Sequence, residues 1–304
     1  MHQLDRHSLK ILNQIREYDS FLDSLKTIAD MGCGSGEDIH WFATLETRDD
    51  PPRPYNYNCF AVDRDPKKLN LVPDLTNIRK IERNFNDTNL FPVTIDLMLS
   101  HDSLQYSTNP LQTLKNWNEM MTPDGMLIVS LQQTSGVEYN RYYSRTSSSC
   151  FYHYTPTNLL YMLAVNGFDC NDAYLLKQFN DPWIHIAVYK SNVAPMDPET
   201  TTWIDLAEKN LLNLSVVKSI HKNGYVRQEE IVYPWLDREN YFVDYVSQWE
   251  NLPGQPEIPE VQGVFNTESE SKENKIKQAP TKVKNTDLLK PIGVLRPPKE
   301  RYVK

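Results

Sequence analysis

Glycine is rare in this chain, yet three glycines fall within five consecutive residues. The sequence holds ten glycines in 304 residues, and Gly32, Gly34 and Gly36 are three of them. An apolar run at 25–30 precedes them, and a helical pattern of apolar residues follows. Glycines between a strand and a helix allow positive φ angles and let a ligand approach the backbone more closely than a Cβ would permit. We therefore predict a ligand-binding bend, because a plain turn usually needs only one glycine.

Apolar segments of strand length alternate with helical patterns along the first 190 residues. One or two short amphipathic helices are expected within 4–25. Strands are expected at 25–30, 59–62, 78–81, 95–99, 126–130, 172–178 and 184–190, and helices after the bend, over 110–121 and over 157–166. Alternation of this kind is typical of a parallel sheet covered by helices on both faces. The sequence predicts an α/β domain over 1–191.

The pattern changes after residue 191. Apolar and aromatic residues recur at helical spacing from 198 to 221, and further aromatic residues follow up to 250, so we predict a mainly helical appendage over 192–250. A hairpin that turns at Asn223-Gly224 is the alternative. Residues 251–304 hold seven prolines, and ten Lys and Arg against seven Asp and Glu. That composition predicts an extended, flexible basic tail.

Composition argues against several classes of protein. The net charge of −8 argues against nucleic-acid binding, which depends on clustered Lys and Arg. No apolar run reaches the roughly 18–20 residues of a membrane-spanning helix, and residues 1–10 lack a signal-peptide pattern, so we expect a cytoplasmic protein that does not bind membranes. The four cysteines lie far apart, and no spacing indicates a metal site, so free thiols and no metal are expected.

The residues around the bend discriminate between nucleotide-type ligands. The dinucleotide pattern G-x-G-x-x-G would need a glycine where Glu37 stands, and the Gly-Lys-Ser/Thr of a phosphate loop is missing. Glu37 and Asp38 also place negative charge at the start of the expected helix, where a pyrophosphate would bind. A nucleoside without phosphates is the ligand class that remains.

The segment Thr27-Ile28-Ala29-Asp30-Met31-Gly32-Cys33-Gly34-Ser35-Gly36 resembles the first motif of class I S-adenosylmethionine-dependent methyltransferases. That family has a Rossmann-like, largely parallel sheet with helices on both faces. The resemblance implies S-adenosyl-L-methionine as the cofactor. It assigns Asp30 to the ammonium end of the cofactor and the backbone around Gly32, Gly34 and Gly36 to its methionine part.

Two further segments resemble later cofactor-binding motifs of the family. Asp63 ends the expected second strand, where the family places an acid that accepts both ribose hydroxyls, and the two oxygens of a carboxylate suit that task. Asp65 is the rival, although Pro66 indicates that Asp65 starts the next helix. Asn86 and Asp87 resemble the third motif, whose acid or amide binds the adenine amino group. The sequence does not choose between these two residues.

The stretch from 95 to 106 resembles the fourth strand of the family and the loop after it. The resemblance places Ser100 among the cofactor-binding residues. His101 lies just past the strand and is the best-placed titratable group to act as a base on an acceptor that carries a proton. Tyr106 and His153 are further catalytic candidates. His153 lies in a tyrosine-rich segment, 139–154, that we expect to fold over the pocket as a lid.

Two classes of function follow from these residues. The first is a methyltransferase that acts on a small molecule or a protein. Ser100-His101-Asp102-Ser103 stands where enzymes that methylate amines of DNA bases usually carry an Asn/Asp-Pro-Pro-Tyr/Phe turn, which argues against a nucleic-acid acceptor. The second is a non-catalytic, methyltransferase-like interaction protein that binds a protein partner through residues 192–304, including the C-terminal tail.

Overall fold

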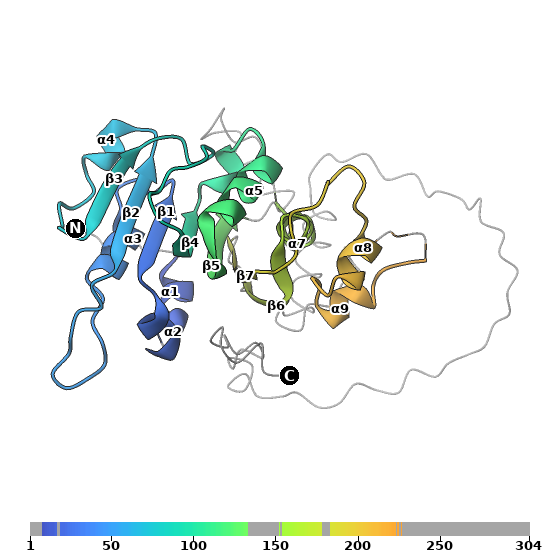
Figure 1. Cartoon of the computed structure of the whole chain (residues 1–304), viewed down its shortest axis with the longest axis horizontal. Coiled ribbons are helices and arrows are strands. Elements are labelled where there is room, and N and C mark those ends of the chain that lie inside the picture. The colour runs from blue at the N-terminus through green and yellow to red at the C-terminus, as the bar shows by residue number, and fades with distance from the viewer. Residues whose placement is uncertain are drawn as a thin grey trace, which may run out of the picture.

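The computed structural model describes residues 8–16, 19–132, 152, 154–177, 183–222, 224 and 226. Within these residues, the strands form one seven-stranded sheet in the order β3-β2-β1-β4-β5-β7-β6, from left to right in Figure 1. The strands are β1 (Thr27–Met31), β2 (Asn58–Asp63), β3 (Ile78–Glu82), β4 (Ile95–His101), β5 (Met121–Gln132), β6 (Phe168–Lys177) and β7 (Trp183–Lys190). The pairs among β1 to β5 are parallel, and β7 runs antiparallel to β5 and β6. The sheet is therefore largely parallel, as the sequence predicts.

Helices cover both faces of this sheet. They are α1 (Leu9–Ile15), α2 (Asp19–Ser24), α3 (Glu37–Ala43), α4 (Pro66–Leu69), the 3-10 helix η1 (Leu104–Tyr106), α5 (Pro110–Met120), α7 (Pro156–Val165), α8 (Trp203–Glu208) and α9 (Leu214–Val217). Successive strand residues point to opposite faces. Ile28 packs in a core with Ile11 of α1 and Phe42 of α3, whereas Ala29 shares a second core with Leu114 of α5. This arrangement confirms the Rossmann-like α/β class.

Local sequence signals set the ends of several helices. Asn109 accepts a hydrogen bond from the backbone nitrogen of Gln112 at the start of α5, and Thr155 forms a capping box at the start of α7. Gly167, after the end of α7, has a φ of 80°, a backbone conformation that suits glycine. The helices expected over 110–121 and 157–166 are thus confirmed.

Strand β5 differs from its expected form. The strand is expected at 126–130, whereas β5 extends over Met121–Gln132 and includes Pro123, Asp124 and Gly125, which are residue types that favour turns. Its register against β4 shifts, because Ile95 pairs with Met121 and Leu97 with Met126. The turn residues form an irregularity inside the strand, because the chain on both sides of them pairs with β4.

The described residues beyond 191 pack on the same core as the sheet. Leu206, Leu211, Leu212 and Val216 belong to the core that contains α7, and α8 lies beside α7 (Figure 1). An antiparallel bridge joins Ile220 to Val226, with Gly224 between them at a φ of 79°, which favours the hairpin alternative at that point. The division at residue 192 stays a prediction. The segment 227–250 and the tail 251–304 lie outside the described residues.

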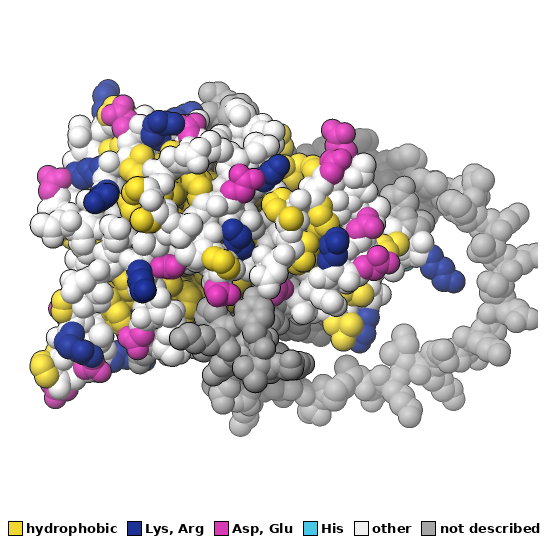
Figure 2. Space-filling view, viewed as in Figure 1, with side chains coloured by type: hydrophobic (Ala, Val, Ile, Leu, Met, Phe, Trp, Pro, Cys, Tyr) yellow, Lys and Arg dark blue, Asp and Glu magenta, His cyan; other side chains and the backbone are white. Residues whose placement is uncertain are grey.

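The surface carries charges of both signs. Lys and Arg are interspersed with Asp and Glu over the face that Figure 2 shows, so the net charge of −8 does not gather into one acidic patch there. None of the helices in the described ranges has the length and apolar character needed to cross a bilayer.

Candidate functional site

The direction in which the chain crosses the sheet defines the place of the candidate site. From β1 the chain proceeds to β2 and β3 on one side, and β4 then pairs with the other side of β1. Ligands of open α/β sheets bind at such a reversal, outside the carboxyl ends of the strands. Asp30, the bend at 32–36, Asp63 and His101 all lie at the carboxyl ends of β1, β2 and β4. The fold therefore brings most of the predicted site residues to one edge.

The glycine bend is fixed to the end of β2 by backbone hydrogen bonds. The nitrogens of Gly32 and Cys33 donate to the carbonyl oxygen of Val62 at 2.8 and 3.0 Å, and the nitrogen of Gly36 donates to that of Cys33 at 2.8 Å. All three glycines have positive φ, 83° at Gly32, 55° at Gly34 and 77° at Gly36. Residues with a Cβ are strained in this conformation, which explains the glycine cluster.

The three glycines face different surroundings. A Cβ on Gly32 would lie 2.5 Å from the Cβ of Ser103, and a Cβ on Gly36 would lie 2.8 Å from the side chain of Val72. Within the part of the chain that the structure describes, a Cβ on Gly34 would meet no atom within 4 Å. Gly32 and Gly36 therefore permit close packing inside the protein, and Gly34 borders open space.

Asp63 lies against the bend. Its Oδ2 accepts a hydrogen bond from the nitrogen of Gly34 at 3.0 Å, and its Oδ1 accepts one from the nitrogen of Asp65 at 2.9 Å. The side chain of Asp65 instead accepts from the nitrogen of Lys67 at 2.9 Å and caps α4, as the sequence predicts. Each carboxylate oxygen of Asp63 retains a further lone pair for a ligand hydroxyl.

Two carboxylates act on the thiol at the centre of the bend. Burial, and after it the charges of Asp30 and Asp63, raise the pKa of the Cys33 thiol, and the charge of Lys68 lowers it by less. Both carboxylates therefore act on the centre of the bend, and Asp30 itself is buried on β1. A field of this sign favours a cationic ligand and disfavours a phosphate.

The two candidates for adenine recognition have different surroundings. The side-chain oxygen of Asn86 accepts a hydrogen bond from the hydroxyl of Thr113 at 2.8 Å, on α5. Asp87 pairs with Arg83 at 2.9 Å, and both of these side chains are exposed. The side chain of Asn86 thus serves the packing of α5, and the choice between the two candidates stays a prediction.

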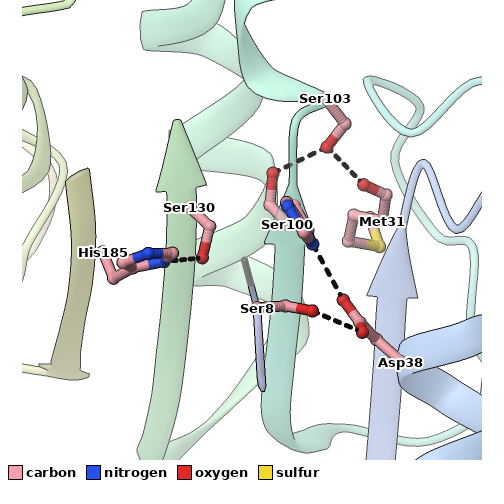
Figure 3. A network of polar contacts seen from close by, with 8 residues as sticks. Ser8, Met31, Asp38, Ser100, Ser103, Ser130 and His185 are labelled. Carbon is pink, nitrogen blue, oxygen red and sulfur yellow. Dashed lines mark hydrogen bonds and ion pairs between the residues drawn. The ribbon is translucent and has the colours of Figure 1, made fainter. Parts of the chain in front are cut away.

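Ser100 takes part in a buried chain of hydrogen bonds (Figure 3). The hydroxyl of Ser103 donates to the carbonyl oxygen of Met31 at 2.6 Å, so Ser100 is the donor in its 2.7 Å contact with Ser103. This chain ties the end of β4 to the end of β1, where the bend begins. Ser103 has a structural role, because it links the two strand ends and lies against Gly32. The sequence does not indicate this role, since no local pattern shows which side chain lies against Gly32.

His101 is held by a side chain that the sequence analysis did not name as a site residue. Its Nδ1 lies 3.1 Å from Oδ2 of Asp38 in α3, and the hydroxyl of Ser8 donates to Oδ1 of Asp38 at 2.7 Å (Figure 3). The ring of Trp183 in β7 meets the imidazole edge-to-face, with 5.0 Å between the ring centroids. The predicted base is thus surrounded by a carboxylate from α3, an aromatic ring from β7 and, behind the carboxylate, a hydroxyl from the residue before α1.

Of the other two catalytic candidates, Tyr106 is described and His153 is not. Tyr106, in η1, packs against the core that contains residues of α5 and α7. Leu97 and Leu99, which alternate with His101 along the same face of β4, belong to the core on the α3 side of the sheet. His153 lies outside the described residues, as do residues 139–151 of the expected lid. Tyr152 and Tyr154 are described, and both contact the segment after β4, through Gln105 and Leu104. Among the described residues, no group of three or more His, Cys, Asp and Glu is arranged to hold a metal ion.

Comparison with known protein families finds one that matches more than half of this sequence. A family model described as a methyltransferase domain matches residues 2–172. No sequence among the curated proteins matches the chain.

Solved structures resemble the fold at low sequence identity. The 1,6-didemethyltoxoflavin-N1-methyltransferase of Burkholderia thailandensis, solved with S-adenosylhomocysteine, is 14% identical, covers 62% of this chain and 80% of its own, and gives a TM-score of 0.45. The plantazolicin methyltransferase BpumL, also solved with S-adenosylhomocysteine, is 12% identical, with 61% and 84% covered and a TM-score of 0.46. The YcgJ protein from Bacillus subtilis is 12% identical, with 62% and 99% covered and a TM-score of 0.46.

Proposed function

The chain belongs to the family of methyltransferase domains, and from that premise we propose that it transfers a methyl group from S-adenosyl-L-methionine to a small-molecule or protein acceptor. One observation carries the proposal. The carboxylate of Asp63 lies on the backbone of Gly34, beside the open space that Gly34 borders. A carboxylate and a bare backbone at the switch point of the sheet fit an adenosine without phosphates.

The residues present also fit the charge of this cofactor. S-adenosyl-L-methionine supplies, when bound, a methyl group on a positively charged sulfur. The sulfur keeps the electron pair of the carbon–sulfur bond when the methyl group is transferred. Its ammonium group adds a second positive charge. The two carboxylates that act on the bend, Asp30 and Asp63, favour such a ligand over a nucleotide.

The protein's own residues would bind and orient the reactants. In the proposal, Asp63 accepts the ribose hydroxyls, Asp30 faces the ammonium group, and the backbone at 32–36 contacts the methionine part. Methyl transfer from a sulfonium needs mainly alignment of the acceptor and exclusion of water. His101 would take the proton of an acceptor that carries one.

A non-catalytic interaction protein is the second candidate. The pairing of His101 with Asp38 favours an enzyme, since cofactor binding alone does not require an oriented base. Binding of a protein partner through the tail at 251–304 stays a prediction.

Calorimetric titration of the full chain with S-adenosylmethionine and S-adenosylhomocysteine tests the proposal. We expect micromolar binding of both ligands, and a loss of tenfold or more for Asp63→Ala, since hydrogen bonds to a charged group contribute about 1.5–3 kcal/mol. Asp65→Ala is the matched control. It removes the cap of α4 at a cost of about 1 kcal/mol and leaves the affinity close to that of the wild type. A folded wild-type protein that binds neither ligand contradicts the proposal.

Turnover needs a separate experiment. The protein is incubated with S-adenosylmethionine that carries a labelled methyl group and with fractionated cell extract. Label on small molecules or on protein identifies the acceptor class. Binding of the cofactor without transfer to any fraction would favour the non-catalytic alternative.

A further inference from the structure

We propose that Asp38 is a positioning residue that fixes the proton of His101 on Nδ1, so that Nε2 is the atom that takes a proton from the methyl acceptor. The inference rests on the proposed function and extends it to the acceptor class. The methylated atom of the acceptor is then an oxygen or nitrogen that carries a removable proton.

The contact between Asp38 and His101 determines the tautomer of the imidazole. A carboxylate has no proton to donate, so the 3.1 Å contact requires a proton on Nδ1 of His101. In the neutral imidazole, Nε2 then bears the lone pair. The carboxylate is itself oriented, because the hydroxyl of Ser8 donates to its other oxygen at 2.7 Å.

The ring of His101 is held from a second side and still reaches the surface. Trp183 meets it edge-to-face at an interplanar angle of 81°. The side chain of His101 remains 23% exposed, whereas His185, the histidine of β7, is 1% exposed and its Nδ1 contacts the hydroxyl of Ser130 at 2.8 Å. Of the two histidines described in β4 and β7, His101 is therefore the one that an acceptor can reach.

The position of Asp38 couples this pair to the bend. Asp38 lies two residues beyond Gly36, in the first turn of α3. The backbone that borders the proposed cofactor space therefore also places the carboxylate. His101 ends β4, which pairs with β1 directly before the bend. One edge of the sheet thus holds both the cofactor-binding backbone and the oriented base.

The proton transfer is balanced without any further group. The proton leaves the oxygen or nitrogen of the acceptor, and the electron pair of that bond stays on the acceptor, which becomes the nucleophile. Nε2 of His101 receives the proton, and the imidazolium that results lies beside the negative charge of Asp38. Solvent then removes the proton from the ring, which is partly exposed.

Nitrogen NMR of the full chain with 15N-labelled histidine tests the tautomer directly. Spectra are recorded at a pH of about 8, and the signals of His101 are assigned by their loss in His101→Gln. We expect a protonated Nδ1 and an unprotonated Nε2 in the wild type. A wild-type His101 that is protonated on Nε2 would overturn the proposal without any variant.

Two variants separate positioning from mere folding. In Asp38→Leu, a side chain of similar size offers Nδ1 no acceptor, so we expect the fixed preference for a proton on Nδ1 to be lost and a proton on Nε2 to become populated, while the other six of the seven histidines keep their signals. Ser8→Ala leaves the carboxylate in place and should keep the wild-type tautomer. A proton that stays fixed on Nδ1 in a folded Asp38→Leu protein would contradict the inference.

Titration of the same wild-type sample with S-adenosylhomocysteine distinguishes failure of this inference from failure of the proposed function. A protein that binds S-adenosylhomocysteine but shows the wrong tautomer refutes the inference alone. A protein that does not bind it refutes the proposed function, and the inference with it.

Discussion

The backbone nitrogen of Gly34 lies 3.0 Å from Oδ2 of Asp63, although 29 residues separate the two in the chain. The parallel register of β1 and β2, in which Met31 pairs with Val62, brings both strands to an end at the same level. The bend after β1 and the acid that ends β2 must therefore meet. This contact joins the fold to the proposed function.

The open side of Gly34 should be sensitive to a single methyl group. Gly34→Ala places a Cβ in space that holds no atom of the described residues within 4 Å, so we expect the affinity for S-adenosylhomocysteine to fall by roughly tenfold or more, for a loss of about 1.4 kcal/mol or more. The positive φ of 55° adds a stability cost of about 1–2 kcal/mol. Calorimetry and urea unfolding measure the two effects.

Gly224→Ala is the matched control for Gly34→Ala. Gly224 also has a positive φ, 79°, and its added Cβ would make an ordinary contact with Ile204 at 3.8 Å. We expect a similar loss of stability with unchanged affinity. Equal losses of affinity in both variants would show that backbone strain, and not the space beside Gly34, affects binding.

Gly32→Ala should destabilise the protein more than Gly34→Ala. Its Cβ would lie 2.5 Å from the Cβ of Ser103, so overpacking adds about 1–3 kcal/mol to the backbone strain. The free energy of unfolding in urea is the measurement. Similar values for the two alanine variants would show that the loop after β4 moves away from the bend at little cost.

Cys33 should resist alkylation although it lies in the bend. Burial, together with the charges of Asp30 and Asp63, raises the pKa of its thiol above the ordinary 9.0, so the thiol keeps its proton at a pH of about 8 and thiolate forms only as the pH rises further. We expect iodoacetamide to modify Cys33 at least roughly tenfold more slowly than in denaturant. Mass spectrometry of the Cys33 peptide gives the rate.

Asp63→Asn tests the cause of that resistance. Removal of one negative charge lowers the pKa of the Cys33 thiol, and the alkylation rate in the folded protein should rise. A rate that does not change with this substitution would mean that the charge of Asp63 does not contribute to the protection of the thiol.

Asn86 and Asp87 should differ in their effect on stability. Asn86→Ala removes one acceptor of the buried hydroxyl of Thr113, which can still donate to the carbonyl oxygen of Asn109 at 3.0 Å, so we expect the free energy of unfolding to fall by about 1 kcal/mol. Asp87→Ala removes an exposed ion pair with Arg83, worth under about 1 kcal/mol. Equal stability of the two variants would contradict the role of the Asn86 side chain in holding α5. Titration of both with S-adenosylhomocysteine decides which one contacts the adenine.

Much of the site could be predicted because its signals are local in the sequence. The glycine spacing, the apolar run before it and the acid that ends the second strand each occupy a few consecutive residues. Pro66 indicates that Asp65 starts the next helix and that Asp63 is the better ribose candidate. The side chain of Asp65 caps α4, as expected. Parallel pairing then brings these local features together without further information.

The remaining parts depend on packing that no short segment encodes. Asp38 and His101 are 63 residues apart, and their contact requires both the rotation of α3 and the pairing of β4 with β1. The sequence showed only that Asp38 adds negative charge after the bend. The register shift that draws the turn at 123–125 into β5 likewise arises from pairing across strands.

A crystal structure of the full chain with S-adenosylhomocysteine tests the central claim most directly. The account requires the ribose hydroxyls within hydrogen-bond distance of the carboxylate of Asp63, and the homocysteine part along the backbone at 32–36. Density for the ligand at any other place, with Asp63 and Gly34 still in contact and no ligand beside them, would contradict the account.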